Sequence, residues 1–470
     1  MAIATVNPAT GETLKTFEAL PAEELDARIA RAAETFRSYR RTPLAQRARW
    51  LHAAADLLDK EVDDIARTMT TEMGKTVNAS RAEVQKCAKG FRFYADNGER
   101  FLADEPADAG AVGALRAYTR YQPIGPILAI MPWNFPLWQV VRFAAPALMA
   151  GNVGLLKHAS NVPQTALYLQ DVLLRAGFPE GAFTTLLIGS GQVEDVLTDP
   201  RIVAATLTGS EGAGVAVGQT SGRELKKAVL ELGGSDPFLV LPSADLERAA
   251  AVATTARVQN NGQSCIAAKR FIVHEAVAEE FERLFNEKMS ALVVGDPTDE
   301  ATDVGPLVNE QGREDVEELV ADAVGKGARI VCGGERIEGP GFYYQPTIVA
   351  DVTPEMRMHQ EELFGPVAQL YRVPDLDAAL KVANGTPFGL GSNAWTQDPD
   401  EQERCINELE AGQVFINGMT TSYPELPFGG TKRSGYGREL SVHGMREFCN
   451  AKTVWVGEGN APEPGAAASE

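Results

Sequence analysis

The sequence predicts an α/β protein made of two consecutive units, each with a parallel sheet and helices on both of its faces. From residue 126 onwards, short apolar runs alternate with amphipathic segments of helical length, and the same alternation resumes after Pro237. Parallel strands need such crossovers, and the crossover helices cover the sheet. The flexible pair Gly233-Gly234 stands between two of the apolar runs, so we place the boundary between the units there.

The first hundred residues come before this alternation and predict amphipathic helices. Leu25, Ile29, Ala32 and Phe36 recur at helical spacing, and a second apolar stripe runs through residues 51–69. Stripes of this kind normally pack on a core, so we assign these helices no chemistry.

The expected strands of both units are short and almost continuously apolar, as strands buried on both faces are. In the first unit they are "PILAIM", "VGLLK", "FTTLLI", "RIVAATLT" and "KKAVLEL". In the second unit they are "PFLVL", "KRFIVH", "ARIVC", "GSNAW" and "GQVFIN". Expected helices follow several of these runs, for example near residues 163–176 and through Val258.

Composition excludes several functional classes. The 470 residues are 44% apolar and carry a formal charge of -20, which argues against a disordered chain and against a nucleic-acid binder. No apolar run approaches the roughly 18 residues of a membrane helix, and the first residues lack the pattern of a signal peptide. We therefore expect a cytoplasmic protein.

Cysteine and histidine usage predicts neither disulfides nor a metal site. The five cysteines are dispersed without a CxxC pair, and the five histidines are scattered. The final residues, 459–470, are small, polar and rich in proline and glycine, which is typical of a mobile tail.

One cysteine stands in an unusual setting. Cys265 lies in "NNGQSCIAAKR", among amides and glycine rather than apolar side chains. A tight loop of backbone N–H groups can help a thiol to ionise, which would make it a nucleophile. The alternative is an incidental loop thiol, and this stretch alone does not separate the two.

Two further polar residues are candidates for the same chemistry. Glu231 ends an apolar strand directly before two glycines, where a partly buried carboxylate could act as a base or simply cap a turn. Asn134 lies between Pro132 and Pro136, where its amide could stabilise an oxyanion or simply form a turn.

A glycine-rich segment offers a weak signal for phosphate binding. "LTGSEGAG", residues 207–214, follows a strand and opens a helix, whose N-terminus could approach a phosphate. Its spacing matches neither the usual dinucleotide fingerprint nor a P-loop. Lys157 ends a strand of the same expected sheet and could meet ribose hydroxyls or a phosphate.

Taken together, six motifs are specific where each alone is not. "PWNFP", "TGS", "ELGGSDP", "GQSCIAAKR", "EELFGPV" and "PFGGTKRSGYGREL" occur in this order over nearly the whole chain. In order and spacing they resemble the aldehyde dehydrogenase superfamily, with bacterial succinate-semialdehyde dehydrogenases as the nearest branch. The resemblance implies oxidation of an aldehyde to its acid through a cysteine thioester, with hydride transfer to NAD(P).

The resemblance also implies the roles of the catalytic residues. Cys265 would attack the aldehyde carbon, and Asn134 with the backbone N–H of Cys265 would hold the oxyanion. Glu231 would activate water to hydrolyse the thioester and could also take the thiol proton. No resident metal is expected.

The same matching implies a set of cofactor contacts: Trp133, Lys157, Ser160, Gly209, Ser210, Leu232, Glu362 and Phe364. Ser160 bears on the choice of cofactor, because relatives that prefer NAD often carry a glutamate there that would repel a 2′-phosphate. Serine allows NADP or NAD, and we favour NADP.

Substrate contacts are implied at Arg142 and Trp138. Arg142 matches an arginine that binds the substrate carboxylate in related succinate-semialdehyde enzymes, whereas Gln259 replaces a second arginine found in part of that group. We expect succinate semialdehyde as the substrate. The alternatives are a broad-specificity aliphatic or aromatic aldehyde dehydrogenase, a thiol hydrolase or acyltransferase, and a non-catalytic structural relative.

The resemblance finally implies an aldehyde dehydrogenase-like division of the chain. We expect a Rossmann-type cofactor-binding domain at residues 1–104 and 124–232 and an α/β catalytic domain at 233–446. A small β oligomerisation arm is expected at 105–123 and 447–458. Such an arm implies a homo-oligomer, either a dimer or a homotetramer. The other expected binding partner is the small aldehyde substrate.

Overall fold

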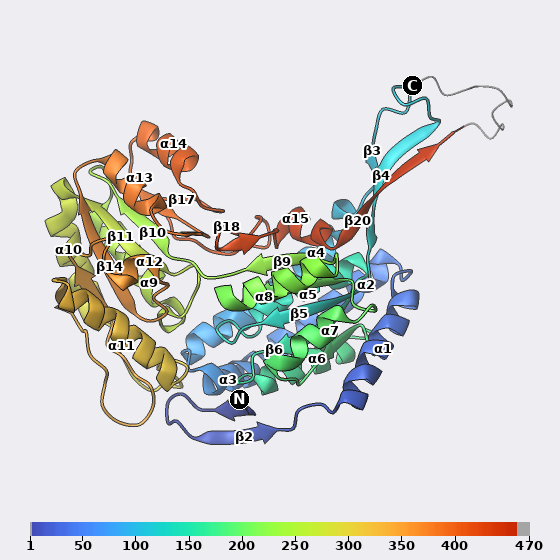
Figure 1. The fold of residues 1–470 in the computed structure, drawn as a ribbon, viewed down its shortest axis with the longest axis horizontal. Coiled ribbons are helices and arrows are strands. Elements are labelled where there is room, and N and C mark those ends of the chain that lie inside the picture. The colour runs from blue at the N-terminus through green and yellow to red at the C-terminus, as the bar shows by residue number, and fades with distance from the viewer. Residues whose placement is uncertain (1, 458–470) are drawn as a thin grey trace.

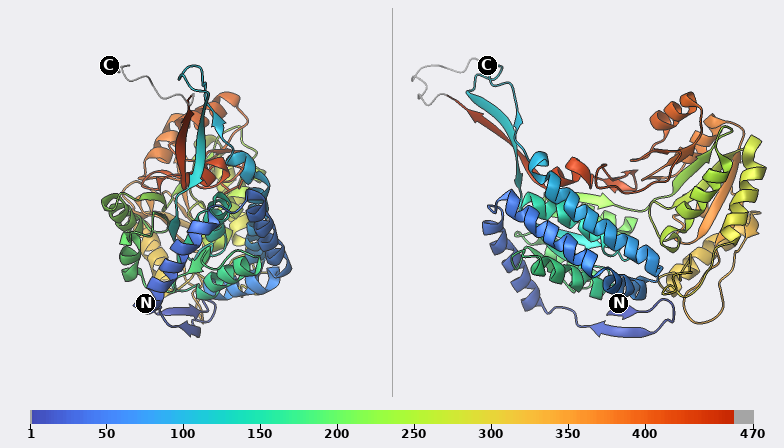
Figure 2. Two further views of the ribbon diagram at one scale, coloured as in Figure 1. Left: turned by 90° about the vertical axis from the view of Figure 1, so that its right-hand side faces the viewer. Right: turned by 180° about the vertical axis from the view of Figure 1, so that it is seen from behind.

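The computed structural model describes residues 2–457, so the expected tail at 459–470 and the last residue of the expected arm lie outside the described part. Two α/β units lie side by side, and a narrow sheet projects from the first of them (Figures 1 and 2). Both units carry the sheets that the strand–helix alternation predicts, and the α/β fold class is confirmed.

The sheet of the first unit has the strand order β19-β9-β8-β5-β6-β7. Its neighbouring strands are parallel, except that β19 runs antiparallel to β9. The bounds are β5 Pro126–Met131, β6 Val153–His158, β7 Phe183–Thr185, β8 Ala204–Thr208, β9 Lys227–Glu231 and β19 Gly435–Tyr436. The run "FTTLLI" therefore forms a strand only over its first three residues.

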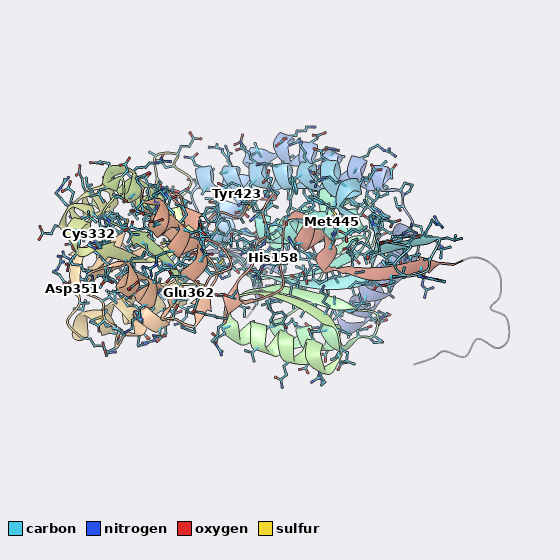
Figure 3. All side chains as sticks on the ribbon, turned by 90° about the horizontal axis from the view of Figure 1, so that it is seen from above. His158, Cys332, Asp351, Glu362, Tyr423 and Met445 are labelled. Atoms are coloured by element: carbon cyan, nitrogen blue, oxygen red, sulfur yellow. The ribbon has the colours of Figure 1, made fainter. Side chains whose placement is uncertain are left out.

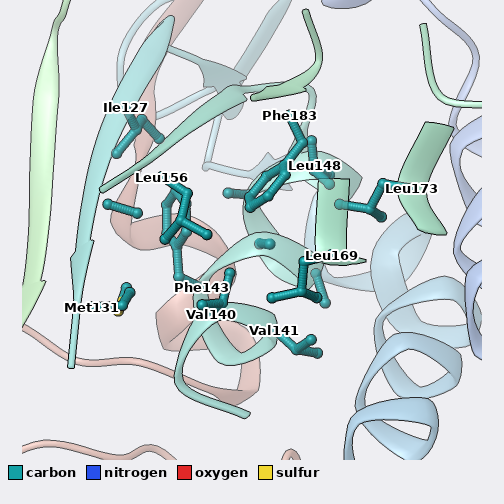
Figure 4. Close-up of a cluster of buried hydrophobic side chains, with 14 of the residues drawn as sticks. Ile127, Met131, Val140, Val141, Phe143, Leu148, Leu156, Leu169, Leu173 and Phe183 are labelled. Carbon is teal, nitrogen blue, oxygen red and sulfur yellow. The ribbon is translucent and has the colours of Figure 1, made fainter. Parts of the chain in front are cut away.

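The helices of the first unit bury the predicted apolar stripes. They are α1 Ala22–Tyr39, α2 Leu44–Lys60, α3 Val62–Met73, α4 Val77–Phe101, α5 Trp138–Ala150, α6 Pro163–Arg175, α7 Val193–Thr198 and α8 Glu211–Arg223, with a short 3₁₀ turn, η1 Ser190–Gln192, before α7. α5 is buried along its whole length, between the sheet and helices α2 and α4. Figure 4 shows the core that β5, β6, β7, α5 and α6 form with one another.

The second unit holds a seven-stranded sheet of order β12-β13-β14-β11-β10-β16-β17. Its strands are β10 Asp236–Val240, β11 Ala268–His274, β12 Arg329–Cys332, β13 Thr347–Ala350, β14 Val367–Val373, β16 Asn393–Trp395 and β17 Phe415–Ile416. Its helices are α9 Leu246–Val258, α10 Glu275–Ser290, α11 Glu310–Gly325, α12 Arg357–Gln360, α13 Leu376–Asn384 and α14 Pro399–Glu408, and the 3₁₀ turn η2 Gln259–Gly262 follows α9. "ARIVC" forms an antiparallel edge strand rather than a parallel one.

The chain returns to the first unit earlier than the expected division places it. β19 pairs with β9, so that Gly435 lies opposite Glu231, and α15 Ser441–Glu447 packs against α5 and α4. A two-residue strand carries almost no local signal, and this pairing depends on contacts between segments about 200 residues apart in the sequence.

Three antiparallel strands form the projecting arm: β3 Glu105–Pro106, β4 Arg116–Pro123 and β20 Cys449–Val456. At the opposite side of the first unit, β1 Ile3–Val6 and β2 Thr13–Phe17 form a hairpin, and β15 Phe388–Gly389 pairs with β18 Thr431–Lys432 near the junction of the units. Within residues 2–457 we find no helix long and apolar enough to span a bilayer, and no group of three or more metal-ligating side chains.

Candidate active site

A cavity of about 260 Å³ lies where the carboxyl ends of β8 and β9 face the second unit. It brings together eight of the residues that the sequence predicted: Cys265, Asn134, Trp133, Gly209, Ser210, Leu232, Glu362 and Phe364. The remaining lining residues are Pro132, Gln139, Thr208 and Gly233. The rings of Trp133 and Phe364, one from each unit, meet edge to face at 5.8 Å between their centroids.

The loop before Cys265 has an unusual backbone. Asn260, Asn261 and Gly262 have φ values of 56°, 58° and 75°, in the left-handed region that asparagine and glycine tolerate best. The amide of Asn261 donates to the carbonyls of Gly74 at 2.8 Å and Pro306 at 2.9 Å, which fixes the loop between two other segments. A Cβ on Gly262 would collide with the backbone of Gly365. This loop therefore needs these residue types to hold the cysteine in place.

A buried lysine and a glutamate hold the backbone of the cysteine loop in place. Lys269 Nζ donates to the carbonyls of Ser264 and Cys265, both at 2.8 Å, and lies 3.3 Å from Glu362 Oε1. The same oxygen of Glu362 accepts from the backbone N–H of Gly234 at 3.1 Å. Glu362 thus connects the cysteine loop to the segment that follows Glu231. Lys269 was not predicted from the sequence, although it stands four residues after the cysteine.

The thiol of Cys265 is neutral in this environment. Cys265 is partly exposed at the cavity, but the surrounding protein atoms keep most water away from its thiol. This desolvation, and secondarily the charge of Glu362, raise the pKa of the thiol to about 12. The charges of Lys269 and Arg142 oppose this shift. The thiol therefore requires a base or a bound positive group before it becomes a good nucleophile.

Glu231 ends β9 and is 1% exposed. Within residues 2–457, neither of its carboxyl oxygens has a hydrogen-bond partner. Burial raises the pKa of Glu231 well above its ordinary value, and the charge of Glu439 adds to the shift while Arg142 opposes it. Glu231 does not line the 260 Å³ cavity, because its carboxyl lies beside Gly429 and this buried pair of charges.

Asn134 faces the cysteine loop from the first unit. Its Nδ2 donates to the carbonyl of Gln263 at 3.1 Å, and its backbone carbonyl accepts from Asn260 Nδ2 at 2.8 Å. One N–H of the Asn134 amide remains unused, and so does the backbone N–H of Cys265, among the hydrogen bonds of the described chain. These two donors are the pair that an oxyanion hole requires.

A buried ion pair, which the sequence did not reveal, holds the segment that carries Asn134. Glu83 accepts from the backbone N–H groups of Leu137 at 2.9 Å and Trp138 at 2.8 Å, at the start of α5. Lys75 pairs with Glu83, and its ammonium lies 4.3 Å from the centre of the Phe135 ring. Both charged groups are buried, so they fix the entry of the chain into α5.

A second cavity of about 370 Å³ lies beside α7 and α8 and is lined by Lys157. Lys157 is 9% exposed, and burial lowers its pKa. Ser210 lines the first cavity and is the N-cap of α8, so the N-terminus of this helix adjoins both cavities. An elongated dinucleotide fits this arrangement, with a pyrophosphate at the N-terminus of α8. Ser160 lines neither cavity, and its carbonyl accepts from Ala4.

The predicted substrate residues lie on α5, beyond the first cavity. Arg142 is buried, pairs with Glu439 and donates to Thr208 Oγ1 at 3.2 Å. Its guanidinium lies 4.4 Å from the centre of the Phe428 ring. Trp138 donates from its indole N–H to Ser422 Oγ at 2.9 Å. The sequence did not predict Glu439, because the pair joins residues far apart in the chain.

Comparison with known proteins gives one family. The model of the aldehyde dehydrogenase family matches residues 1–454. The chain is 66% identical over 458 residues to succinate-semialdehyde dehydrogenase (NADP+) 1 of Mycobacterium ulcerans, covering 97% of this chain and 100% of that protein. It is 64% identical over 466 residues to succinate-semialdehyde dehydrogenase (NADP+) of Mycobacterium avium, covering 99% of each chain.

Solved structures agree with this match. A succinic semialdehyde dehydrogenase from Streptococcus pyogenes, in complex with NADP+, superimposes with a TM-score of 0.94 at 37% identity, covering 97% of this chain and 100% of that one. An NAD-dependent aldehyde dehydrogenase from Sinorhizobium meliloti gives a TM-score of 0.95 at 31% identity, covering 99% of this chain and 93% of that one.

Proposed function

This chain belongs to the aldehyde dehydrogenase family, and we propose that it oxidises succinate semialdehyde to succinate with NADP+ as the hydride acceptor. The observation that carries the proposal is the 66% identity, over the full length of the relative, to an enzyme named for this substrate and cofactor. The cavity that joins Cys265, Asn134 and Glu362 supplies the chemistry.

We assign the first step to Cys265. The thiol first releases its proton to the solvent, and the resulting thiolate attacks the aldehyde carbon. The oxyanion accepts from the unused N–H of Asn134 and from the backbone N–H of Cys265. Glu362 and Phe364 would hold the nicotinamide of the cofactor, which would supply the acceptor for the hydride on this carbon. A thioester on Cys265 then remains.

We assign hydrolysis of the thioester to Glu231. A buried carboxylate with a raised pKa is a stronger base than a solvated one and can take a proton from water. Both carboxyl oxygens lack hydrogen bonds within the described chain, so no such bond opposes a rotation of the side chain. We propose that the side chain rotates toward the cavity to reach the thioester.

We propose that the cofactor spans the two cavities. Lys157 would meet the adenosine ribose, and Gly209 and Ser210 the pyrophosphate, at the N-terminus of α8. Glu362 and Phe364 would contact the nicotinamide end, near Trp133 and Leu232. Ser160, which carries no negative charge, leaves a 2′-phosphate unopposed and so favours NADP+.

We propose that Arg142 attracts the substrate carboxylate. None of the hydrogen bonds in residues 2–457 uses its Nη1 group, which leaves this donor for a ligand.

We further propose a homo-oligomer that associates through the β3–β4–β20 arm. A cytoplasmic location is supported by the five cysteines, which all lie in the described part as free thiols and suit a reducing compartment.

A matrix of initial rates tests the substrate and the cofactor together. Succinate semialdehyde and butanal, which have chains of equal length, are each assayed with NADP+ and with NAD+. We expect the highest kcat/KM for succinate semialdehyde with NADP+. Equal values for the two aldehydes would favour the broad-specificity alternative, and a higher value with NAD+ would reverse the cofactor assignment.

A further inference from the structure

Lys86 is a half-buried cation beside the proposed substrate side of the site. It lies on α4, where its ammonium donates to Ser422 Oγ at 2.7 Å and stands 4.5 Å from the centre of the Trp138 ring. Among the described residues, no carboxylate lies within ion-pair distance of it, so one hydroxyl is its polar partner. Such a group is usually paired or fully solvated.

The hydroxyl of Ser422 leaves a donor unused. Ser422 is 4% exposed, and its oxygen accepts from both Lys86 and the indole N–H of Trp138. A hydroxyl has two acceptor lone pairs and one O–H donor, so both lone pairs are occupied. In the described chain its O–H donates to no acceptor, and Lys86 uses one of its three N–H groups. The pair therefore presents several donors and a positive charge, but no acceptor.

This donor cluster is connected to the reaction centre through α5. Trp138 lies four residues after Asn134 and four residues before Arg142, and the next residue, Gln139, lines the cavity of Cys265. The charge of Arg142 lowers the pKa of both the Cys265 thiol and Lys86. Burial lowers the pKa of Lys86 to about 8.

The charges in this region do not balance. Arg142 already has an anionic partner, because it pairs with Glu439. Lys86 has no such partner, although Arg142 repels it and burial disfavours its charge. An anion that bound to Lys86 would relieve both penalties.

The cluster opens toward the surface at one loop. Residues 417–430 connect β17 to β18. They run from the second unit, where the backbone N–H of Thr420 donates to Asn393, to α4, where Ser422 accepts from Lys86. Figure 3 shows Tyr423 of this loop beside the blue helices, and Tyr423 and Leu426 are 43% and 53% exposed. Lys86 itself is half-buried, so part of its side chain is open to the solvent.

We propose that Lys86 and Ser422 bind the carboxylate of the aldehyde substrate, and that Lys86 determines the preference for an ω-carboxy aldehyde. This inference rests on the proposed function and adds a residue to it. The carboxylate would accept from the Lys86 ammonium and the Ser422 hydroxyl, while Trp138 packs against the methylene groups. Arg142 would assist from the next turn of α5.

Steady-state kinetics of the full-length enzyme with NADP+ test this proposal. Lys86→Met removes the charge and keeps most of the aliphatic stem. We expect it to raise KM for succinate semialdehyde by about 10- to 100-fold, as loss of a charge-assisted hydrogen bond does, with KM for butanal changed by less than about 3-fold. Lys86→Arg should restore most of the selectivity.

Lys89 provides the matched control. It lies on the same helix, three residues further on, and pairs with Glu425 of the same loop at 3.2 Å. Lys89→Met should leave KM for both aldehydes unchanged within about 2-fold. Should Lys86→Met fail to fold, Ser422→Ala serves in its place and should raise KM for succinate semialdehyde by about 3- to 10-fold, and KM for butanal less.

The possible outcomes separate the two proposals. The role of Lys86 is overturned if the preference for succinate semialdehyde survives both Lys86→Met and Ser422→Ala, or if KM rises equally for both aldehydes. The proposed substrate would stand in either case. A wild type that does not discriminate succinate semialdehyde from butanal would overturn the proposed substrate, and the carboxylate subsite with it.

Discussion

Cys265 and Glu231, the two titratable residues of the proposed mechanism, share one electrostatic feature. The pKa of each is raised, mainly by burial. A thiol that is neutral at rest resists oxidation and alkylation, since the thiolate is the reactive form. Cys265 therefore stays unreactive until binding changes the electrostatics of the cavity.

The rate of alkylation of Cys265 should report this directly. With its pKa at about 12, the thiol of the unliganded enzyme should react with iodoacetamide about tenfold faster for each unit of pH up to at least pH 10, because only the thiolate reacts. Mass spectrometry of the peptide that contains Cys265 separates it from the other four cysteines. A plateau near neutral pH would contradict the raised pKa.

Glu231→Gln should separate the two chemical steps. Glutamine keeps the shape but cannot accept a proton, so hydrolysis of the thioester should slow by about 10²- to 10⁴-fold while the first turnover persists. Stopped-flow absorbance should therefore show a burst of reduced nicotinamide followed by a slow steady state.

Two other results would change the role of Glu231. Loss of the burst together with steady-state turnover would assign Glu231 to activation of the thiol. Unchanged turnover would exclude it from the mechanism.

At the scale of elements, the site depends on how α3, α4 and α5 meet the cysteine loop. The turn between α3 and α4 supplies the carbonyl of Gly74 to Asn261, and Lys75 and Glu83 fix the start of α5. These helices carry none of Cys265, Asn134 and Glu231, yet they hold the loops of Asn134 and Cys265 opposite each other. The expectation that the first hundred residues only form a core was therefore incomplete.

Glu83→Gln should destabilise the protein and disturb the segment of Asn134. It leaves Lys75 buried without its partner, which typically costs about 3–5 kcal/mol. Urea denaturation measures the loss, and kcat should fall more than KM changes, because the oxyanion donor moves.

The double variant Lys75→Met/Glu83→Gln is the control for this prediction. It buries no unpaired charge and should recover part of the stability. A change in the free energy of unfolding below about 1 kcal/mol for Glu83→Gln would show that this pair is unimportant.

At the scale of the whole molecule, the projecting arm is not explained by the fold of one chain. β4 and β20 pair over eight residues, and Val112, Leu115 and Trp455 on or beside the arm are 53%, 58% and 55% exposed. Exposed apolar residues on a long antiparallel sheet commonly mark an interface between subunits.

Trp455→Asp should weaken the proposed assembly. A carboxylate cannot be buried in an apolar interface without a partner, so light scattering coupled to size exclusion should show a smaller species than the wild type. A wild type with the mass of one chain, 50.5 kDa, would exclude the oligomer, and an assembly unchanged by the substitution would place the interface elsewhere.

Much of this protein was determined by local sequence. The alternation of strands and helices, the buried faces of the first helices and the polar setting of Cys265 arise from neighbouring residues, whose periodicity sets which side chains can be buried together. The six motifs led to the family by the same route, because each occupies a few consecutive positions.

Only the tertiary structure decided which charges meet. Arg142 pairs with Glu439, Lys86 meets Ser422 across 336 residues, and Glu231 loses its hydrogen bonds on burial. These contacts form when long loops close, so no local pattern encodes them. Their strength also depends on how far water is excluded, which is a property of the folded chain as a whole.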